Sequence, residues 1–229
     1  RRVLFRSDGD DVEFTAEQII DNFRNAYRNY IPFSFWDDKE FYIQALVEKI
    51  DLKNLFEPVF KKFRIRYANT KGWGDINSRA NMMEQFREWE DKGKQCILLY
   101  CGDHDPGGLQ ISDSLRENMN EIAEAVGWLP DELIIDRFGL NKDFIDEQNL
   151  TWIDNLETAS GKDLGNPTHR DYNASYVQDY IEQYGRRKVE ANALVTRIEE
   201  GRELCRQASP SFGSVGWFVR IFPEGHLQV

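Results

Sequence analysis

Cysteine is scarce in this sequence, and its spacing excludes two classes of protein. The 229 residues contain three cysteines, Cys96, Cys101 and Cys205, and none of them belongs to a Cys-x-x-Cys pair. This pattern fits neither a zinc site built from paired cysteines nor a disulfide-stabilised secreted scaffold. We therefore expect the cysteines to be small core residues of a protein in a reducing compartment.

Long hydrophobic runs are also missing. No apolar stretch approaches the roughly 18–20 residues that span a membrane, and no basic and apolar leader opens the chain. We expect an intracellular protein, in the cytoplasm or at the nucleoid, that does not contact a membrane. The first six residues, Arg1–Arg6, look like the end of an upstream element, which suggests that the sequence is a piece of a longer protein.

An excess of positive charge is the third absence. Lys and Arg number 29 against 40 Asp and Glu, which gives a formal net charge of −11 at pH 7. Bulk electrostatics therefore opposes binding to nucleic acid. The objection is not decisive, because a cation bound by acidic residues offsets part of their charge. Basic clusters also remain at residues 61–66 and 186–188, although a solvated surface is the default interpretation of either cluster.

Several familiar motifs do not occur. The chain has no internal repeat and no low-complexity tract. It has no Gly-x-x-x-x-Gly-Lys phosphate-binding loop, and no ladder of Asp and Asn with a closing Glu indicates an EF-hand. The composition, with 41% hydrophobic and 13% aromatic residues, is that of an ordered globular protein. The length allows one large domain or two small ones.

Strand and helix patterns alternate in residues 41–140 and indicate an α/β fold. Strands are predicted at 41–47, 63–68, 95–101 and 133–138, where apolar residues are continuous or alternate. Apolar residues at helical spacing separate them, at 52–63, 78–89 and 111–126, and Pro58 must begin a new turn or kink the first helix. This order predicts a Rossmann-like parallel sheet.

The flanking regions are predicted to be mostly helical. A capping box at 15–18 begins an amphipathic helix that ends before Pro32, so residues 1–40 form a helical lead-in. Residues 141–229 form a helical C-terminal extension. Within it, residues 141–172 are short helices and loops, residues 174–184 and 189–208 are helices, and residues 217–222 are a short strand. The core domain is therefore expected at 41–140.

The stretch from Cys96 to Leu109 carries the strongest chemical signal. A continuous apolar run ends at Asp103 and Asp105, and a Pro-Gly-Gly turn then leads into a helical pattern. Such a run is typical of a strand buried on both faces of a parallel sheet, and these folds bind ligands at the carboxyl ends of their strands. The two aspartates would lie about 6–7 Å apart on one side of an extended backbone. Because they repel each other unless a cation or proton intervenes, a site for a hard ion such as Mg²⁺ is predicted.

Glu48 supplies a third carboxylate. It ends the strand at 41–47 as Asp103 ends the strand at 95–101, so both are expected at the same edge of the parallel sheet. His104 lies between the two aspartates, and alternation points its side chain away from them, towards a supporting or packing role. His169 and His226 lie in predicted loops and have no partner that the sequence identifies.

Three groups of residues resemble a known domain. They are Glu48-Lys49 after a strand, Gly72 and Ser78 around a loop and helix start, and Tyr100-x-Gly-Asp-His-Asp-Pro-x-Gly108. These motifs look like the Toprim domain, in the variant of the topoisomerase VI A subunit and the related meiotic double-strand-break proteins; many phage and mobile-element proteins carry a similar domain. Downstream, Tyr180-x-x-x-Tyr184-Gly185 and residues 189–194 are similar to the Lys-x-Glu-x-x-Ala-Leu helix that follows the Toprim core in that group. The resemblance covers roughly residues 41–204 and is strongest at 103–108.

The resemblance implies Mg²⁺-dependent cleavage or strand transfer on the DNA backbone, with Mn²⁺ as an alternative ion. Asp103 and Asp105 would carry the ion, and Glu48 would either ligate it or act as general acid or base for the 3′-oxygen. A cation at this position stabilises the charge that develops on the phosphoryl and leaving oxygens. Lys49 would add positive charge at the same edge, although surface exposure is its default interpretation. Further candidates for contact with the substrate are Gly72, Ser78, Gly107 and Glu190.

The sequence departs from the family in one respect. Topoisomerase VI-type enzymes carry their nucleophilic tyrosine on an upstream winged helix, and no such domain fits in residues 1–40. Tyr27 and Tyr30 have helical spacing with Phe23 and are expected to be packing residues. Either the winged helix lies outside this sequence or in a partner, or water is the nucleophile and the protein is a nuclease. Homodimerisation and an ATPase partner follow from analogy with the fold family alone.

Two other functions stay open. In the first, the chain is a non-catalytic DNA-binding or assembly module whose metal only organises DNA or a partner. In the second, the Asp-x-Asp motif is that of a haloacid-dehalogenase phosphatase, and a small phosphoester would phosphorylate Asp103. Against the second, the motif here closes the third predicted strand and runs directly into a Pro-Gly turn.

Overall fold

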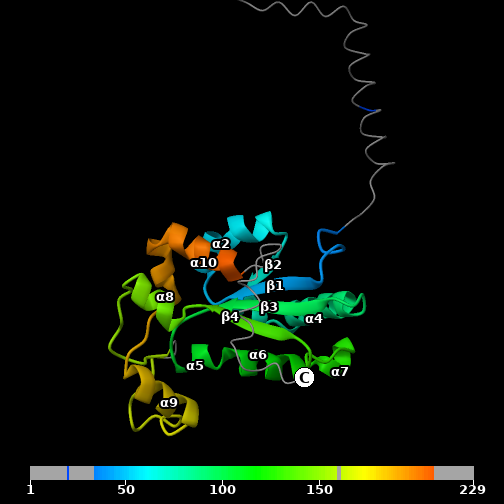
Figure 1. The fold of residues 1–229 in the computed structure, drawn as a ribbon. Coiled ribbons are helices and arrows are strands. Elements are labelled where there is room, and N and C mark those ends of the chain that lie inside the picture. Colours follow the sequence, from blue (N-terminus) through cyan, green and yellow to red (C-terminus); the bar gives the residue numbers. More distant parts are fainter. Residues whose placement is uncertain (1–19, 21–33, 159–160, 209–229) are drawn as a thin grey trace, which may run out of the picture. The chain divides into compact units, whose positions relative to one another are not determined.

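A four-stranded parallel sheet forms the centre of the protein (Figure 1). The computed structural model describes residue 20, residues 34–158 and residues 161–208. The strands are β1 (Phe41–Val47), β2 (Arg66–Asn69), β3 (Gln95–Cys101) and β4 (Ile134–Gly139). Their order is β2-β1-β3-β4, and every neighbouring pair is parallel. The predicted α/β class with a parallel sheet is therefore confirmed. The predicted strand at 217–222, His226 and, apart from Ile20, the predicted helix that contains Tyr27 and Tyr30 lie outside the described residues.

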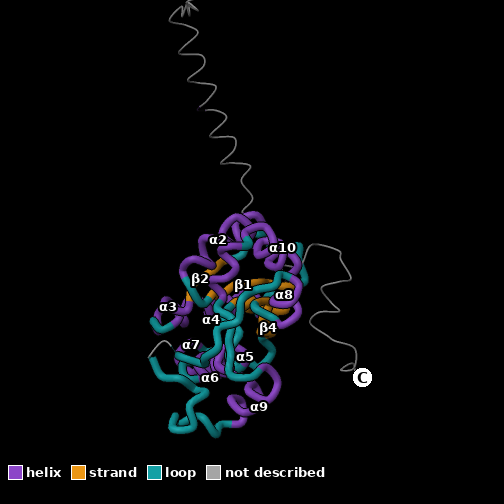
Figure 2. The backbone as a smooth tube through the Cα atoms, turned by 90° about the vertical axis from the view of Figure 1, so that its left-hand side faces the viewer, coloured by secondary structure: helices purple, strands orange, loops and turns teal. Residues whose placement is uncertain are grey.

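Helices cover both faces of this sheet (Figures 1 and 2). One face carries α2 (Ile50–Lys62) and α10 (Ile198–Ala208), and the other carries α4 (Ile76–Glu90), α6 (Ile111–Asn120) and α7 (Ala123–Val126). Helix α2 shows why the layers form, because its buried residues recur at helical spacing and include Leu52, Phe56 and Phe60. Pro58 lies inside α2, which continues past it to Lys62.

The two central strands are the most deeply buried part of the fold. Residues 42–47 of β1 and 96–101 of β3 are all buried, as their continuous apolar sequences predict. The edge strand β2 is only partly buried. Aromatic rings join the layers, with the ring centroids of Phe56 and Phe138 5.5 Å apart and those of Tyr42 and Phe86 5.9 Å apart.

Residues 39–208 belong to one compact unit. After the sheet, this unit continues through α8 (Lys142–Glu147), α9 (Ser175–Tyr184), the 3₁₀ helix η1 (Ala191–Thr196) and α10. Helix α10 packs against α2 and β4, so the C-terminal segment completes one layer over the sheet. No helix among the described residues is long and apolar enough to cross a membrane.

Four predicted elements differ in the structure. The strand predicted at 63–68 forms only at Arg66–Asn69, because α2 extends to Lys62 and Phe63 is its C-cap. The predicted loop at 69–77 contains one helical turn, α3 (Thr70–Trp73). The predicted helix at 111–126 is divided into α6 and α7, and a separate turn, α5 (Pro106–Leu109), precedes it. The predicted helix at 189–208 is wrong over its first part. There, Val189 pairs with His104 in a β-bridge and Lys188 pairs with Ile153, so their backbone groups bond to other segments instead of to a helix.

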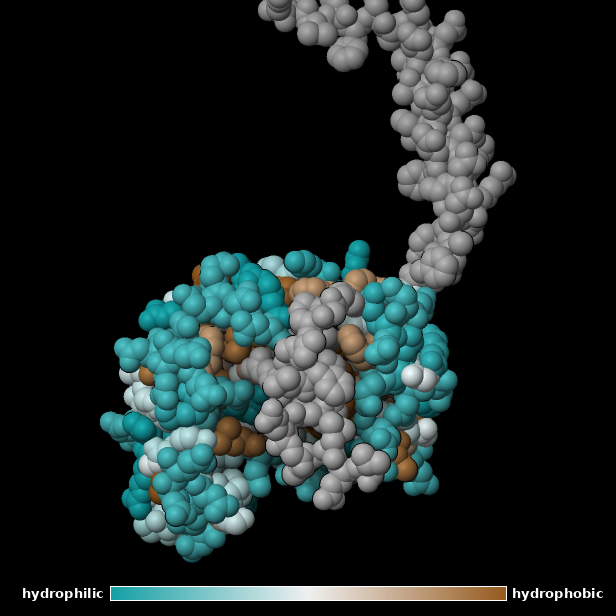
Figure 3. Space-filling model, viewed as in Figure 1, coloured by the Kyte–Doolittle hydropathy of each residue, from teal (hydrophilic) through white to brown (hydrophobic). Residues whose placement is uncertain are grey.

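Hydrophilic side chains predominate on the face shown in Figure 3, and apolar patches there are small and scattered. The most exposed large apolar side chains come from separate elements, for example Ile50 in α2, Ile76 in α4 and Leu129 in a loop. Single exposed apolar residues of this kind are normal on globular proteins.

Strand order and register bring β1 and β3 to a common end. The chain passes from β1 to β2 on one side of the sheet and from β3 to β4 on the other, so the direction of winding switches between β1 and β3. Val47 is paired with Cys101, the last residue of β3. The residues after both strands therefore emerge side by side, at the position where open α/β sheets bind their ligands.

Candidate active site

Glu48 and Asp103 meet where β1 and β3 end. The Asp103 backbone N–H donates to Glu48 Oε2 at 2.6 Å, and the Tyr100 hydroxyl lies 3.4 Å from the same oxygen. Gly102 makes this approach possible, because a Cβ there would lie 2.3 Å from the Tyr100 hydroxyl oxygen and 2.5 Å from Glu48 Oε2. Position 102 must therefore be glycine, because any side chain there would displace the Glu48 carboxylate or the Tyr100 hydroxyl.

The pKa of the Glu48 carboxyl is raised. Burial is the largest cause, and the nearby Asp103 carboxylate raises it further, while the hydrogen bond from the Asp103 N–H opposes both. A carboxyl whose pKa lies closer to neutrality exchanges protons more readily at physiological pH. A bound cation would have the opposite effect and favour the ionised form.

The Asp103 carboxylate is bonded to backbone and to a cation of the protein itself. Its Oδ1 accepts the Ala191 N–H at 2.7 Å and lies 3.0 Å from Lys49 Nζ. Lys49 Nζ also lies 3.4 Å from Glu190 Oε2, and Glu190 Oε1 lies 3.2 Å from Lys188 Nζ. Asp103, Lys49, Glu190 and Lys188 thus form a row of alternating charges. The Asp103 side chain is only 10% exposed, so its charge depends on these partners.

The same row of charges shifts the pKa values of Lys49 and Glu190. Burial acts to lower the pKa of Lys49, but the carboxylates of Asp103, Glu190 and Glu48 outweigh it and the pKa is raised. The hydrogen bond from Lys188 lowers the pKa of Glu190, and Lys49 adds to this effect. Lys49 is therefore a positive charge at the carboxyl edge of the sheet that is held in place by the carboxylates of Asp103 and Glu190.

Asp105 does not join the other two carboxylates directly. It is the N-cap of α5, and its Oδ1 accepts the Gly108 N–H at 2.6 Å. Burial raises the pKa of Asp105, and this hydrogen bond opposes the shift. The second glycine of the turn is sterically required, because a Cβ on Gly108 would lie 2.1 Å from the Asp103 carbonyl oxygen.

Arg137 on β4 holds this turn together, and the sequence prediction missed it. Its guanidinium donates to the carbonyl oxygens of Asp103 at 2.8 Å, Gly108 at 2.9 Å and Leu140 at 2.6 Å. Burial lowers the pKa of Arg137, although an arginine stays protonated under such conditions. The available signal was an arginine within an otherwise largely apolar strand.

His104 has the supporting position that strand alternation predicts. Its side chain is buried, its Nδ1 lies 3.0 Å from the Leu140 carbonyl oxygen, and its ring contacts the rings of Trp152, Tyr180 and Tyr184. Burial lowers the pKa of His104 to about 4, so the ring is neutral at pH 7. His104 therefore packs α9 onto the end of β3.

The other predicted contact residues have varied positions. Gly72 belongs to α3, the turn that the Thr70 hydroxyl ties to the Glu48 carbonyl oxygen at 2.8 Å. Ser78 is in the first turn of α4, where its hydroxyl and N–H bond to the N-cap residue Asp75. Ser78 is thus committed to helix capping. Gly107 opens α5 and lines a cavity beside it.

The two basic clusters lie at different edges of the sheet. Helix α2 starts at the carboxyl edge after β1 and ends where β2 begins, so residues 61–66 lie at the amino edge, away from the carboxylates. Residues 186–188 precede Glu190 at the carboxyl edge. Within them, Lys188 is buried, and the Arg187 guanidinium lies 4.2 Å from the centre of the Trp152 ring. Only Arg186 of this cluster is exposed.

The carboxylates suit a hard cation, but they are fewer than the sequence predicts. Among residues 20, 34–158 and 161–208, no three His, Cys, Asp or Glu side chains are grouped closely enough to hold a metal ion. Glu48 and Asp103 remain as a pair of carboxylates whose charges act on each other. Proteins commonly hold Mg²⁺ through one or two carboxylates, with water and substrate phosphate as the other ligands. The pair therefore fits Mg²⁺, with Lys49 displaced from Asp103.

Comparison with models of protein families, with curated proteins and with solved structures finds no match. The function is therefore inferred from the positions and chemistry of the residues at the carboxyl edge. The likeness to the Toprim group remains an expectation from sequence motifs.

Proposed function

We propose that the protein is a Mg²⁺-dependent enzyme that cleaves the DNA backbone or transfers its strands, with a Toprim-like site. The observation that carries this proposal is the approach of Glu48 and Asp103 at the switch point of the sheet, joined by the 2.6 Å hydrogen bond. Two carboxylates at this position bind a hard cation well and repel a phosphate without one.

Each residue of the site has a role in this proposal. Glu48 and Asp103 would hold the ion, which when bound would stabilise the negative charge that develops on the phosphoryl and leaving oxygens. The raised pKa of Glu48 supports a second role for it as general acid or base at the 3′-oxygen. Lys49, released from Asp103, would contact the phosphate, and Asp105 and Arg137 position the backbone around Asp103.

The nucleophile is either water or the tyrosine that a winged helix would supply. Tyr100 is unsuited to that role, because it is buried beside Glu48 and burial raises the pKa of its hydroxyl. Hydrolysis would need only the residues already described, together with the cation and water. Strand transfer would also need a winged helix that carries a tyrosine, from an upstream segment or from a partner. Only a strand-transfer enzyme would be expected to form a homodimer and to need an ATPase partner.

Nicking of supercoiled plasmid in Mg²⁺ or Mn²⁺ tests the proposal. Asp103→Asn keeps an oxygen for the Ala191 N–H but loses the negative charge, and we expect it to slow nicking by roughly a hundredfold or more. Asp131→Asn is the matched control, because Asp131 is exposed in a loop, and it should nick like the wild type. No nicking by the full-length protein with either ion, or undiminished nicking by Asp103→Asn, contradicts the proposal.

One observation favours a second candidate, a non-catalytic DNA-binding or assembly module. The 3.0 Å ion pair between Lys49 and Asp103 already neutralises one carboxylate of the site. Under this alternative, DNA binding would persist without nicking and Lys49→Gln would weaken it. A third possibility, a phosphatase, would hydrolyse a generic small phosphoester and would leave the plasmid intact. This result would distinguish it from both the DNA-cleaving enzyme and the non-catalytic module.

A further inference from the structure

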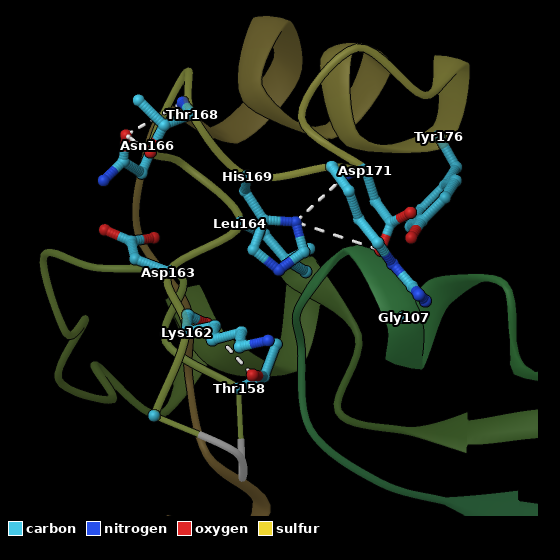
Figure 4. A pocket seen from close by; sticks show the side chains of 12 residues that line it. Gly107, Thr158, Lys162, Asp163, Leu164, Asn166, Thr168, His169, Asp171 and Tyr176 are labelled. Carbon is cyan, nitrogen blue, oxygen red and sulfur yellow. Dashed lines mark hydrogen bonds and ion pairs between the residues drawn. The ribbon is translucent and has the colours of Figure 1, made fainter.

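A cavity of about 1010 Å³ opens beside the candidate active site (Figure 4). It lies between the start of α5, the segment around residues 161–171 and the first turn of α9. Gly107 lines it, and Gly107 is flanked in sequence and space by the Asp105 carboxylate. Its volume is at the upper end of the roughly 300–1,000 Å³ typical of small-ligand pockets. The cavity is therefore an extension of the active-site edge with room for a large ligand group.

Hydrogen-bond donors in this cavity are oriented by their own neighbours. His169 Nδ1 accepts the Asp171 N–H at 3.1 Å, so a neutral His169 ring carries its proton on Nε2. Asn166 Oδ1 accepts both the N–H and the hydroxyl of Thr168, at 3.0 Å and 2.9 Å. Figure 4 shows the Asn166 amide on the side of the His169 ring opposite to Tyr176, so the His169 ring is the donor that faces the middle of the cavity. Figure 4 shows the His169 ring in the middle of these lining residues.

The lining of the cavity carries two cationic side chains, Lys162 and Arg170, and two carboxylates, Asp163 and Asp171. Asp163 Oδ1 accepts the N–H groups of Leu156 and Gly165, and Asp171 is paired with Arg170 at 3.0 Å. Both lining carboxylates are thus engaged within the protein. Within the part of the chain that the structure describes, no carboxylate lies within ion-pair distance of the Lys162 ammonium, which is available to a phosphate.

Tyr176 provides the cavity with a flat apolar surface. It is half-buried and packs against a small core formed by Leu156, Leu164, Val177 and Tyr180. The same side chain lines the cavity near Gly107 (Figure 4). An aromatic ring supported in this way is a platform on which a nucleobase can stack.

We propose that this cavity holds one unpaired nucleotide of the DNA strand, next to the phosphate bound at Asp103 and Glu48. The base stacks on Tyr176, an acceptor atom of the base faces the His169 donor, and a phosphate contacts Lys162. A base that is still paired and stacked in a duplex cannot present its ring to Tyr176, so the cavity selects single-stranded or opened DNA. This inference rests on the proposed function, which places a DNA phosphate at the adjacent carboxylates.

Binding by the full chain with Ca²⁺ in place of Mg²⁺, an oxygen-binding ion that can occupy the carboxylates, tests the cavity separately from cleavage. A short labelled single strand, the corresponding blunt duplex and a free nucleoside monophosphate are compared by fluorescence anisotropy and competition. The single strand should bind more tightly than the other two. Tyr176→Leu and Lys162→Gln should each weaken single-strand binding by roughly five- to a hundredfold, whereas Tyr176→Phe keeps the ring and should bind like the wild type. The matched control for Lys162→Gln is Lys92→Gln, at a position outside the cavity, which should leave binding unchanged.

Each contrary outcome has a distinct meaning. Equal binding of single strand and duplex, or single-strand binding that is unaltered in Tyr176→Leu, overturns the proposal for the cavity. So does monophosphate binding as tight as that of the strand, because it identifies a small-molecule pocket. Plasmid nicking that persists alongside these results leaves the proposed function intact. Absence of metal-dependent nicking with Tyr176-dependent strand binding overturns the proposed function alone.

Discussion

Glu48 links the chemistry of the site to the pH dependence of folding. Its raised pKa means that the folded protein holds this proton more tightly than the unfolded chain does. The resulting stabilisation is fully present below the ordinary pKa of 4.5 and is lost as the pH rises through the folded value. We predict that, in a chelator, the wild type loses unfolding free energy with rising pH more steeply than Glu48→Gln does. Urea unfolding at a series of pH values measures this difference.

Gln at position 48 keeps an oxygen for the Asp103 N–H, so the comparison isolates the charge. Asp105, whose pKa is also raised, contributes in the same direction and leaves part of the slope in the variant. Added Mg²⁺ should stabilise the wild type at neutral pH more than Glu48→Gln, because the ion would bind the ionised pair. If the unfolding free energies of the wild type and Glu48→Gln change in parallel with pH, the pKa of Glu48 is not raised by folding. Glu132→Gln removes an exposed carboxylate and is the control for the loss of one negative charge.

Substitution by alanine should affect stability strongly at one glycine of the Pro-Gly-Gly turn and hardly at the other. A Cβ at Gly108 would lie 2.1 Å from the Asp103 carbonyl oxygen, so Gly108→Ala must displace backbone that carries the site. We expect a loss of about 1–3 kcal/mol in unfolding free energy and loss of metal-dependent nicking. At Gly107 the nearest atom would be Asp105 Oδ1 at 3.6 Å, an ordinary contact, so Gly107→Ala should change stability by less than about 0.5 kcal/mol. Thermal and urea unfolding of both variants decide the point.

Among the elements, α9 is hydrogen-bonded to the segment after β3 through the Tyr180 hydroxyl. Tyr180 donates to the carbonyl oxygens of His104 at 2.8 Å and Arg187 at 2.9 Å. We predict that Tyr180→Phe costs about 1 kcal/mol of unfolding free energy, because buried carbonyls lose a donor. Tyr184→Phe is the matched control, since the structure shows the Tyr184 ring, and not its hydroxyl, against His104. Equal stability of the two variants in urea would contradict this role for Tyr180.

The bounds of the two buried central strands could be predicted to the residue. The bounds of helices were predicted less well where backbone groups bond to distant segments instead of within a helix. The strands at 41–47 and 95–101 match β1 and β3, since burial on both faces demands continuous apolar sequence. The predicted helix at 189–208 fails at its start because the N–H of Val189 donates to His104 and that of Ala191 to Asp103. No periodicity in a local sequence reveals such distant partners.

The same distinction holds for the candidate site. Strand ends in a parallel sheet were enough to predict that Glu48 and Asp103 lie together. The turn of Asp105 towards Gly108, the bonds of Arg137 and the pairing of Lys49 with Glu190 depend on loop geometry and on residues far apart in sequence. The sequence therefore predicted the location of the site better than the connections of its charges.

For the molecule as a whole, an acidic surface and a DNA-directed function are compatible only if few phosphates are contacted. The net charge is −11, and several cations near the site are already engaged, Lys49 with Asp103 and Glu190, and Lys188 with Glu190. We therefore expect DNA affinity in Mg²⁺ to have a shallow salt dependence, with a slope of about −3 in log K against log salt, as for three or four phosphate contacts.

The positions of the two basic clusters at opposite edges of the sheet predict which of them contributes to the salt dependence of DNA affinity. Arg186 is exposed at the carboxyl edge with the site, so Arg186→Gln should reduce the magnitude of the slope by about 1 and weaken binding to all sequences alike. Lys61 and Lys62 end α2 at the amino edge, and Lys61 is paired with Glu57, so the double substitution to Gln should leave the slope unchanged. Fluorescence anisotropy with labelled DNA over a range of salt concentrations measures both. Weaker binding by the double variant would place the DNA on the opposite edge of the sheet, where the carboxylates of β1 and β3 could not reach it.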